Sequence, residues 1–160
     1  INLIEPFFIN YIDNNIMAIN LFTEKQQEQI VAAIKEAELN TSGEIKVHIE
    51  KKCEEEVLDH AAFMFDELEI QKTELRNGAL IYLAVEDRAL AILGDTGINL
   101  KVPNNFWDAT RDVMIKHFKE GEFAEGLANG IKLAGVQLKE YYPYESDGVN
   151  ELSDEISFGD

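Results

Sequence analysis

Two short apolar runs joined by a charged turn constrain the fold of this chain more than any other stretch. Residues 79–85 read ALIYLAV, residues 89–93 read ALAIL, and Glu86-Asp87-Arg88 lies between them. Runs of this length, preceded by the turn signal Asn77-Gly78, predict two strands of a β-hairpin. The first run is almost continuously apolar, which is typical of a central strand covered on both faces. The hairpin therefore predicts a sheet with further layers packed against it.

Helices are predicted on both sides of the hairpin, together with one further strand. Thr23 and Gln26 form a T-x-x-Q capping box that starts a helix running to about Leu39. Strict alternation over residues 44–50 predicts a strand with a buried face. Apolar residues at helical spacing predict three more helices, over residues 54–68, 103–121 and 122–142. The order α-β-α-β-β-α-α predicts an α/β fold: an α/β/α sandwich with a small central mixed β-sheet flanked by helices.

The chain of 160 residues is long enough for one domain with its own core. We expect that domain to span residues 21–143. Residues 1–20 are expected to be an N-terminal extension, with Met17 as the natural start of the protein. Residues 144–160 are acidic and lack periodicity, which predicts a flexible tail. Within it, the apolar-acidic segment 149–158 is expected to dock either on the domain or on a partner.

The net negative charge favours some classes of partner over others. The chain has 31 acidic and 14 basic residues, for a formal net charge of −17. Such a surface repels nucleic acid and anionic lipid and favours cations or a basic protein partner. No stretch reaches the roughly 18 apolar residues of a membrane helix, so no membrane insertion is expected. The absence of a signal-peptide pattern predicts a cytoplasmic location.

Acidic residues in loops are the candidates for a metal site. Asp95 lies in Gly94-Asp95-Thr96-Gly97, and Asp87 lies in the hairpin turn. Antiparallel strands would put these two at opposite ends of the hairpin, so Asp95 would gather instead with Glu44 or with Asp108. Carboxylate oxygens are ligands that suit Ca²⁺ or Mg²⁺. The alternative is that Asp95 is a turn residue that binds its own backbone.

The remaining chemistry-bearing residues give no catalytic pattern. Arg88 could hold an anion through its guanidinium fork, or it could form an internal ion pair. The single cysteine, Cys53, excludes an internal disulfide and is expected to be partly buried rather than a nucleophile. The three histidines lack metal-ligand spacing and are expected to be surface or core-edge residues; they are His48, His60 and His117. The serines considered, Ser42 and Ser153, have no G-x-S-x-G context, which disfavours a serine hydrolase.

Four segments in a characteristic order resemble a known family. They are Thr41-Ser42-Gly43-Glu44-Ile45-Lys46-Val47, Asn77-Gly78-Ala79-Leu80-Ile81-Tyr82-Leu83, Asp87-Arg88 with Ile92-Leu93-Gly94-Asp95-Thr96-Gly97-Ile98, and Phe118-Lys119-Glu120-Gly121-Glu122-Phe123-Ala124-Glu125-Gly126-Leu127. Together they resemble the TPM domain, a family named after a thylakoid lumen protein, a photosystem II repair protein and a receptor modulator from worms. The ending at residues 150–158 resembles that of a short bacterial subgroup. The resemblance implies an α/β/α sandwich with a central mixed sheet.

Two functions are expected from these observations. The first is an accessory or protein-interaction module, because no catalytic set converges and the acidic C-terminal tail ends in apolar residues. The second follows from the resemblance: some plant members are described as acid phosphatases that bind calcium through acidic residues. In that case this chain would be a divalent-cation-dependent phosphomonoesterase with Asp95 as a metal ligand.

Overall fold

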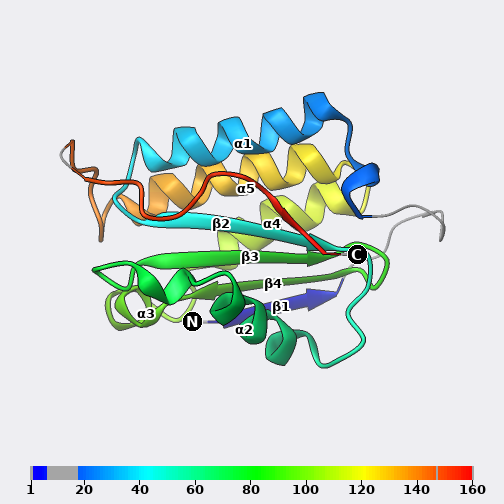
Figure 1. Cartoon of the computed structure of the whole chain (residues 1–160), viewed down its shortest axis with the longest axis horizontal. Coiled ribbons are helices and arrows are strands. Elements are labelled where there is room, and N and C mark those ends of the chain that lie inside the picture. Colours follow the sequence, from blue (N-terminus) through cyan, green and yellow to red (C-terminus); the bar gives the residue numbers. More distant parts are fainter. Residues whose placement is uncertain (1, 7–17, 147, 160) are drawn as a thin grey trace.

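A single mixed sheet of five strands lies between helical layers in the computed structural model, which describes residues 2–6, 18–146 and 148–159 (Figure 1). The strand order is β1-β4-β3-β2-β5. The strands are β1 (Asn2–Pro6), β2 (Glu44–Glu50), β3 (Gly78–Ala84), β4 (Ala89–Gly94) and β5 (Ser157–Phe158). The α-helices are α1 (Glu24–Glu38), α2 (Val57–Glu67), α3 (Thr96–Lys101), α4 (Asp108–Phe118) and α5 (Phe123–Leu138), with short 3-10 turns at Ala18–Leu21 and Ile70–Lys72.

The predicted hairpin forms the centre of the sheet. β3 and β4 pair antiparallel from Ala79 opposite Gly94 to Ala84 opposite Ala89, and every residue of both strands is buried. β2 pairs parallel with the other edge of β3, with Glu44 opposite Gly78 and Glu50 opposite Ala84. The prediction of a central strand covered on both faces is therefore confirmed for β3.

Helices cover both faces of the sheet, which confirms the predicted α/β/α sandwich. One core joins α1, α4 and α5 to the face of β2 that carries Ile45, Val47 and Ile49. The other core joins α2 to the opposite face of the hairpin, which carries Leu80 and Tyr82. Figure 1 shows α1 and α5 above the sheet and α2 below it. No helix of the described residues is both long and apolar enough to cross a membrane.

Local sequence signals explain where α1 begins and how closely α5 packs. The capping box is confirmed: the Thr23 hydroxyl accepts from the Gln26 N–H, and the Gln26 side chain accepts from the Thr23 N–H. On α5, a Cβ atom at Gly135 would lie 2.7 Å from the Cα of Ala37 on α1. Glycine there allows the two helix backbones to approach more closely than any side chain would permit.

Residues 94–97 differ from the predicted loop. They lead into the short helix α3, whose N-cap is Asp95. The Asp95 carboxylate accepts from the N–H of Thr96, as an N-cap side chain does. Glycine has a low helix propensity, so two glycines among these four residues did not indicate a helix. The next helix, expected from residue 103, begins at Asp108, because residues 103–107 form turns before it.

Both ends of the chain contribute to the sheet, which differs from the predicted domain limits. Residues 2–6, expected to lie in an extension, form β1 and pair antiparallel with β4. The predicted acidic tail is held on the domain near its end, where β5 pairs parallel with β2. A two-residue strand is too short to show alternation, so the sequence pattern carried no signal for it. Segment 149–158 was expected to dock either on the domain or on a partner, and in the structure it docks on the domain.

Candidate functional site

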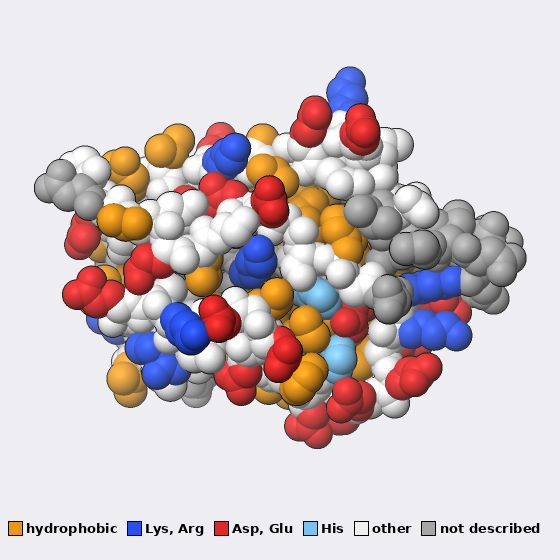
Figure 2. Space-filling view, in the orientation of Figure 1, with side chains coloured by type: hydrophobic (Ala, Val, Ile, Leu, Met, Phe, Trp, Pro, Cys, Tyr) orange, Lys and Arg blue, Asp and Glu red, His pale blue; other side chains and the backbone are white. Residues whose placement is uncertain are grey.

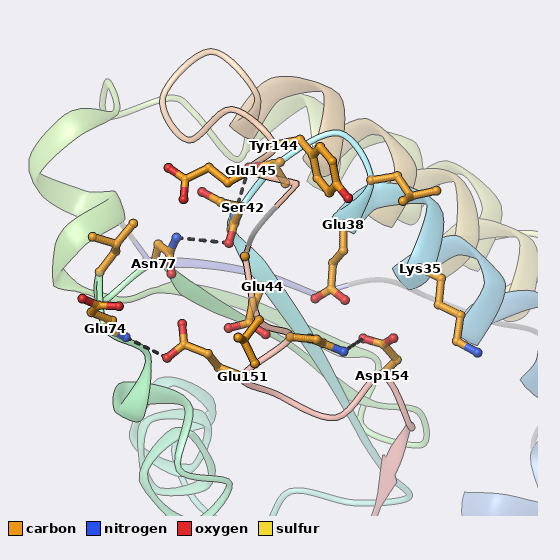
Figure 3. A pocket seen from close by; sticks show the side chains of 17 residues that line it. Lys35, Glu38, Ser42, Glu44, Glu74, Asn77, Tyr144, Glu145, Glu151 and Asp154 are labelled. Carbon is orange, nitrogen blue, oxygen red and sulfur yellow. Dashed lines mark hydrogen bonds between the residues drawn. The ribbon is translucent and has the colours of Figure 1, made fainter.

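An acidic pocket of about 760 Å³ lies at the end of the sheet where β2 and β3 begin (Figure 3). Its walls come from the end of α1, the turn before β2, the connection before β3 and the segment 144–154. The carboxylates that line it are Glu38, Glu44, Glu74, Glu145, Glu151 and Asp154, against one basic residue, Lys35. In Figure 3 the carboxylates of Glu38, Glu44 and Asp154 face the same space.

Exposed apolar side chains surround this pocket. Seven large apolar residues are strongly exposed among the described residues, and four of them line the pocket. These four, with their exposed fractions, are Leu39 (67%), Leu75 (49%), Tyr144 (50%) and Val149 (80%). Exposed apolar side chains gathered in one region mark interaction sites on proteins. The combination of carboxylates inside and apolar side chains around them is therefore a candidate binding site.

Glu38 connects α1 to the start of β2. Its Oε2 atom accepts from the backbone N–H of Ile45 at 3.2 Å. Burial raises the pKa of Glu38 to about 9, and the neighbouring Asp154 carboxyl adds to the rise. The side chain is thus held in its neutral form at pH 7, because an isolated negative charge would be poorly solvated there.

Glu44, the first residue of β2, is also buried under the pocket. Its Oε1 atom accepts from the N–H of Leu152 at 2.7 Å. Burial raises the pKa of Glu44 to about 7, although hydrogen bonds from the backbone of Leu152 and Glu151 oppose the rise. A positive group entering the pocket would favour the charged form of Glu44 and Glu38.

Asn77 presents an unused acceptor at the same pocket. The residue is 2% exposed, and its side-chain Nδ2 donates to the backbone oxygen of Ser42 at 3.2 Å. Its Oδ1 atom is buried and has no hydrogen-bond partner among the described residues. A buried amide oxygen left without a donor costs free energy. The wall of the pocket therefore contains an unsatisfied acceptor.

The wall formed by the C-terminal segment is held by alternate side chains of β2. Glu44 accepts from the N–H of Leu152, and Lys46 Nζ donates to the backbone oxygens of Ser153 (3.3 Å) and Glu155 (2.8 Å). Further along β2, His48 Nδ1 lies 2.8 Å from the Ser157 hydroxyl. These side chains, which the sequence places on the polar face of a strand, therefore bind the end of the chain. We call residues 151–158 the C-terminal strap.

The structure separates the predicted metal ligands. Asp87 lies in the exposed turn between β3 and β4 and accepts from the N–H of Cys53. Asp95 lies beyond the other end of the hairpin, as expected from antiparallel pairing. The Asp95 carboxylate, which is 4% exposed, takes two hydrogen bonds from Arg76, at 2.7 and 2.8 Å. That carboxylate is thus already engaged by a cation.

The other predicted site residues also lie apart. Glu44 lies opposite Gly78, whose oxygen accepts from the Asp95 N–H, but the Glu44 carboxylate contacts the C-terminal strap instead. Asp108 starts α4 and lies 3.7 Å from an Arg111 nitrogen. Arg88 occupies the hairpin turn with a left-handed φ of 55°, and its role in binding an anion stays a prediction. Within the described parts of the chain, no group of three or more His, Cys, Asp or Glu side chains is placed to hold a metal ion.

Sequence reasoning missed most of the pocket. Glu38 lies in no motif, Asn77 was noted only as part of a turn signal, and Asp154 is 116 residues from Glu38. The available signal was indirect: Thr41-Ser42-Gly43 and Arg76-Asn77-Gly78 both precede neighbouring parallel strands, whose starts must meet at one edge. Figure 2 shows why charge alone was uninformative, because acidic side chains are scattered widely over the face of the molecule.

Comparison with known proteins agrees with this architecture. A family model described as the TPM domain matches residues 17–137. The NMR structure of the BA42 protein from the psychrophilic bacterium Bizionia argentinensis is 47% identical, with a TM-score of 0.83, and the match covers 86% of this chain and 95% of that one. No curated protein matches the chain.

Two more distant structures share the fold alone. The N-terminal domain of a protein from P. gingivalis is 19% identical, with a TM-score of 0.62, over 78% of this chain and 82% of that one. The N-terminal domain of the cg2496 protein from Corynebacterium glutamicum is 15% identical, with a TM-score of 0.55, over 87% of this chain and 80% of that one.

Proposed function

The chain belongs to the TPM domain family, and on that premise we propose that it is an accessory domain that binds a protein partner through the acidic pocket. The observation that carries the proposal is the gathering of exposed apolar side chains around a pocket lined by carboxylates. A partner that fits both features presents a lysine or arginine side chain flanked by apolar residues.

Charge supports a basic partner. The formal net charge of −17 attracts a cationic segment at long range, and complementary charge speeds association more than it strengthens the final complex. Inside the pocket, an ammonium group would donate hydrogen bonds to carboxylate oxygens. The apolar stem of lysine and its neighbours would contact Leu39 and Tyr144 at the rim.

A short basic peptide tests this proposal. The probe is an amidated pentapeptide, Leu-Lys-Phe-Lys-Leu, titrated into the ¹⁵N-labelled full chain, with a matched peptide in which glutamate replaces lysine. We expect chemical-shift changes at backbone amides of residues 38–44 and 73–77 with the lysine peptide alone. Binding should weaken when sodium chloride is raised from 50 to 500 mM, because exposed charges are screened. Equal changes with both peptides, or changes elsewhere on the domain, would contradict the proposal.

Paired variants distinguish binding at the pocket from attraction by the overall negative charge of the chain. Glu145→Lys changes a pocket carboxylate and Glu120→Lys changes an exposed one at the end of α4, so the change in net charge is the same. We expect only Glu145→Lys to weaken binding. For the apolar rim, Leu39→Ala should weaken binding, whereas Leu100→Ala, at a residue 87% exposed away from the pocket, should not.

Phosphomonoester hydrolysis with Ca²⁺ or Mg²⁺ stays a prediction from the family resemblance. Even with Glu38 neutral, a pocket lined by five further acidic residues and one lysine repels phosphate unless cations first neutralise it. Hydrolysis of p-nitrophenyl phosphate with and without 5 mM CaCl₂ or MgCl₂ measures this activity directly. The cytoplasmic location likewise remains a prediction.

A further inference from the structure

A second cluster of hydrogen-bonded side chains lies toward the other end of β2, outside the acidic pocket. His48 Nδ1 lies 2.8 Å from the Ser157 hydroxyl, and His48 Nε2 lies 2.9 Å from Glu50 Oε1. The other oxygen of Glu50 accepts from the Tyr82 hydroxyl at 2.6 Å and lies 2.8 Å from His60 Nε2. His48 and Glu50 share one face of β2 because side chains alternate along a strand.

This arrangement sets the proton positions on His48. Burial by itself would raise the pKa of Glu50, but hydrogen bonds from Tyr82 and His48 lower it below its ordinary value. Glu50 is therefore a carboxylate, which only accepts, so the hydrogen of His48 must be on Nε2. Burial lowers the pKa of His48, which keeps the ring neutral. The unprotonated Nδ1 atom is then free to accept the hydrogen of the Ser157 hydroxyl.

We propose that Ser157 is a nucleophile for acyl transfer from a small ester, with His48 as its general base and Glu50 as a positioning residue. A serine, a neutral histidine and a carboxylate in this order form the arrangement that activates serine in hydrolases, and it is recognised by geometry rather than by sequence order. This activity is independent of the partner binding proposed for the acidic pocket.

Ser157 lies at an edge of the sheet. β5 is the edge strand, and Ser157 is only partly buried. The Gly159 N–H donates to the Ile49 oxygen on β2, so the preceding N–H, that of Phe158, points to the open side of the strand. The N–H of the residue after the nucleophile is one of the two oxyanion donors in α/β-hydrolases.

The reaction balances without any further cofactor. The Ser157 oxygen attacks the ester carbonyl carbon while its proton moves to His48 Nδ1. The bond from that carbon to the alcohol oxygen breaks, and the alcohol leaves with the proton from His48. Water then attacks the acyl-serine, His48 accepts the proton of the water, and the acid is released as the proton returns to Ser157.

A fluorophosphonate probe tests the nucleophile on the full chain. Its phosphorus bonds to the Ser157 oxygen, the phosphorus–fluorine bond breaks, and the hydroxyl proton leaves with fluoride. We expect peptide mass spectrometry to find one adduct, on Ser157, absent from Ser157→Ala and unchanged in Ser153→Ala. His48→Gln should slow labelling about 100-fold, as expected for loss of a general base. No adduct on Ser157, or labelling of His48→Gln at the wild-type rate, would overturn the proposal.

One further measurement needs no variant, and a second tests Glu50. Ring ¹⁵N shifts of His48 in the unmodified protein should report a hydrogen on Nε2 and a bare Nδ1; a hydrogen on Nδ1 would overturn the proposal. For Glu50, we expect Glu50→Ala to abolish that tautomer preference and to slow labelling at least tenfold, while Glu50→Asp restores both in part. Glu145→Lys, in the acidic pocket, should leave labelling unchanged. Failure of the labelling experiment can therefore be distinguished from failure of the peptide-binding experiment.

Discussion

Glu44 and Leu152 are joined by a hydrogen bond across 108 residues of chain, with 2.7 Å between Glu44 Oε1 and the Leu152 nitrogen. Leu152 is 9% exposed and packs in the core beneath α2. The same bond therefore places a carboxylate at the floor of the acidic pocket and fixes the C-terminal strap as one of its walls. Two strap residues, Glu151 and Asp154, line the pocket.

Removing the Glu44 carboxylate should loosen the strap. We expect Glu44→Ala to lower the free energy of unfolding by about 1–3 kcal/mol, because a buried N–H loses its acceptor. Hydrogen exchange at the Leu152 amide should accelerate more than exchange in β3. The control is Glu74→Ala, an exposed carboxylate of the same pocket, which should change stability by less than about 0.5 kcal/mol. Unchanged exchange at Leu152 would show that other contacts hold the strap.

Stability should fall as the pH rises from about 5 to 9. The pKa of Glu38 is raised from 4.5 to about 9 and that of Glu44 to about 7, so the folded state binds protons more tightly than the unfolded state in this range. The stabilisation is complete below pH 4.5 and is lost as the pH passes the folded-state pKa values.

Urea unfolding at pH 5, 7 and 9 measures this slope. Glu38→Gln should reduce it, since glutamine stays neutral throughout, whereas Glu28→Gln at an exposed position of α1 should not. A stability that rises over this range, or an equal slope in both variants, would contradict the predicted protonation of Glu38.

The Asp95 carboxylate should stabilise the domain through Arg76 and the cap of α3 rather than through a metal ion. Asp95→Asn keeps the capping oxygen but removes the charge that Arg76 binds, so we expect a lower melting temperature. Asp95→Ala also removes the cap and should lower it further, since a lost N-cap costs about 1 kcal/mol. A thermal scan with 1 mM CaCl₂ at matched ionic strength completes the comparison. A calcium-induced rise present in wild type and absent from Asp95→Asn would restore Asp95 as a ligand.

Close contact between α1 and α5 should make Gly135 intolerant of a side chain. A Cβ atom there would lie 2.7 Å from both the Cα and the Cβ of Ala37. In an open helix, Gly→Ala would stabilise by about 1 kcal/mol. We expect Gly135→Ala instead to destabilise by about 1–3 kcal/mol, because overpacking forces the helices apart. Val136→Ala, at the next and 57% exposed position, is the control and should be nearly neutral in urea unfolding.

Most of the secondary structure was readable from the sequence because its signals are local. The alternation of residues 44–50 matches β2 without error, and the capping box at Thr23 places the start of α1. The order of the elements was enough to predict the α/β/α sandwich, since apolar strands between amphipathic helices must be covered on both faces. The signals failed where elements are short, as in α3 and β5.

How the residues of the candidate sites come together was decided by the tertiary structure. The sequence by itself determined that His48 and Glu50 lie on one face of a strand, because side chains alternate with a period of two. It contained no signal that Ser157 would lie 2.8 Å from His48, or that Glu38, Glu44 and Asp154 would share a pocket. Pairing of β5 with β2 is a contact between segments more than 100 residues apart, and its stability depends on packing and desolvation, which appear only when the chain is folded.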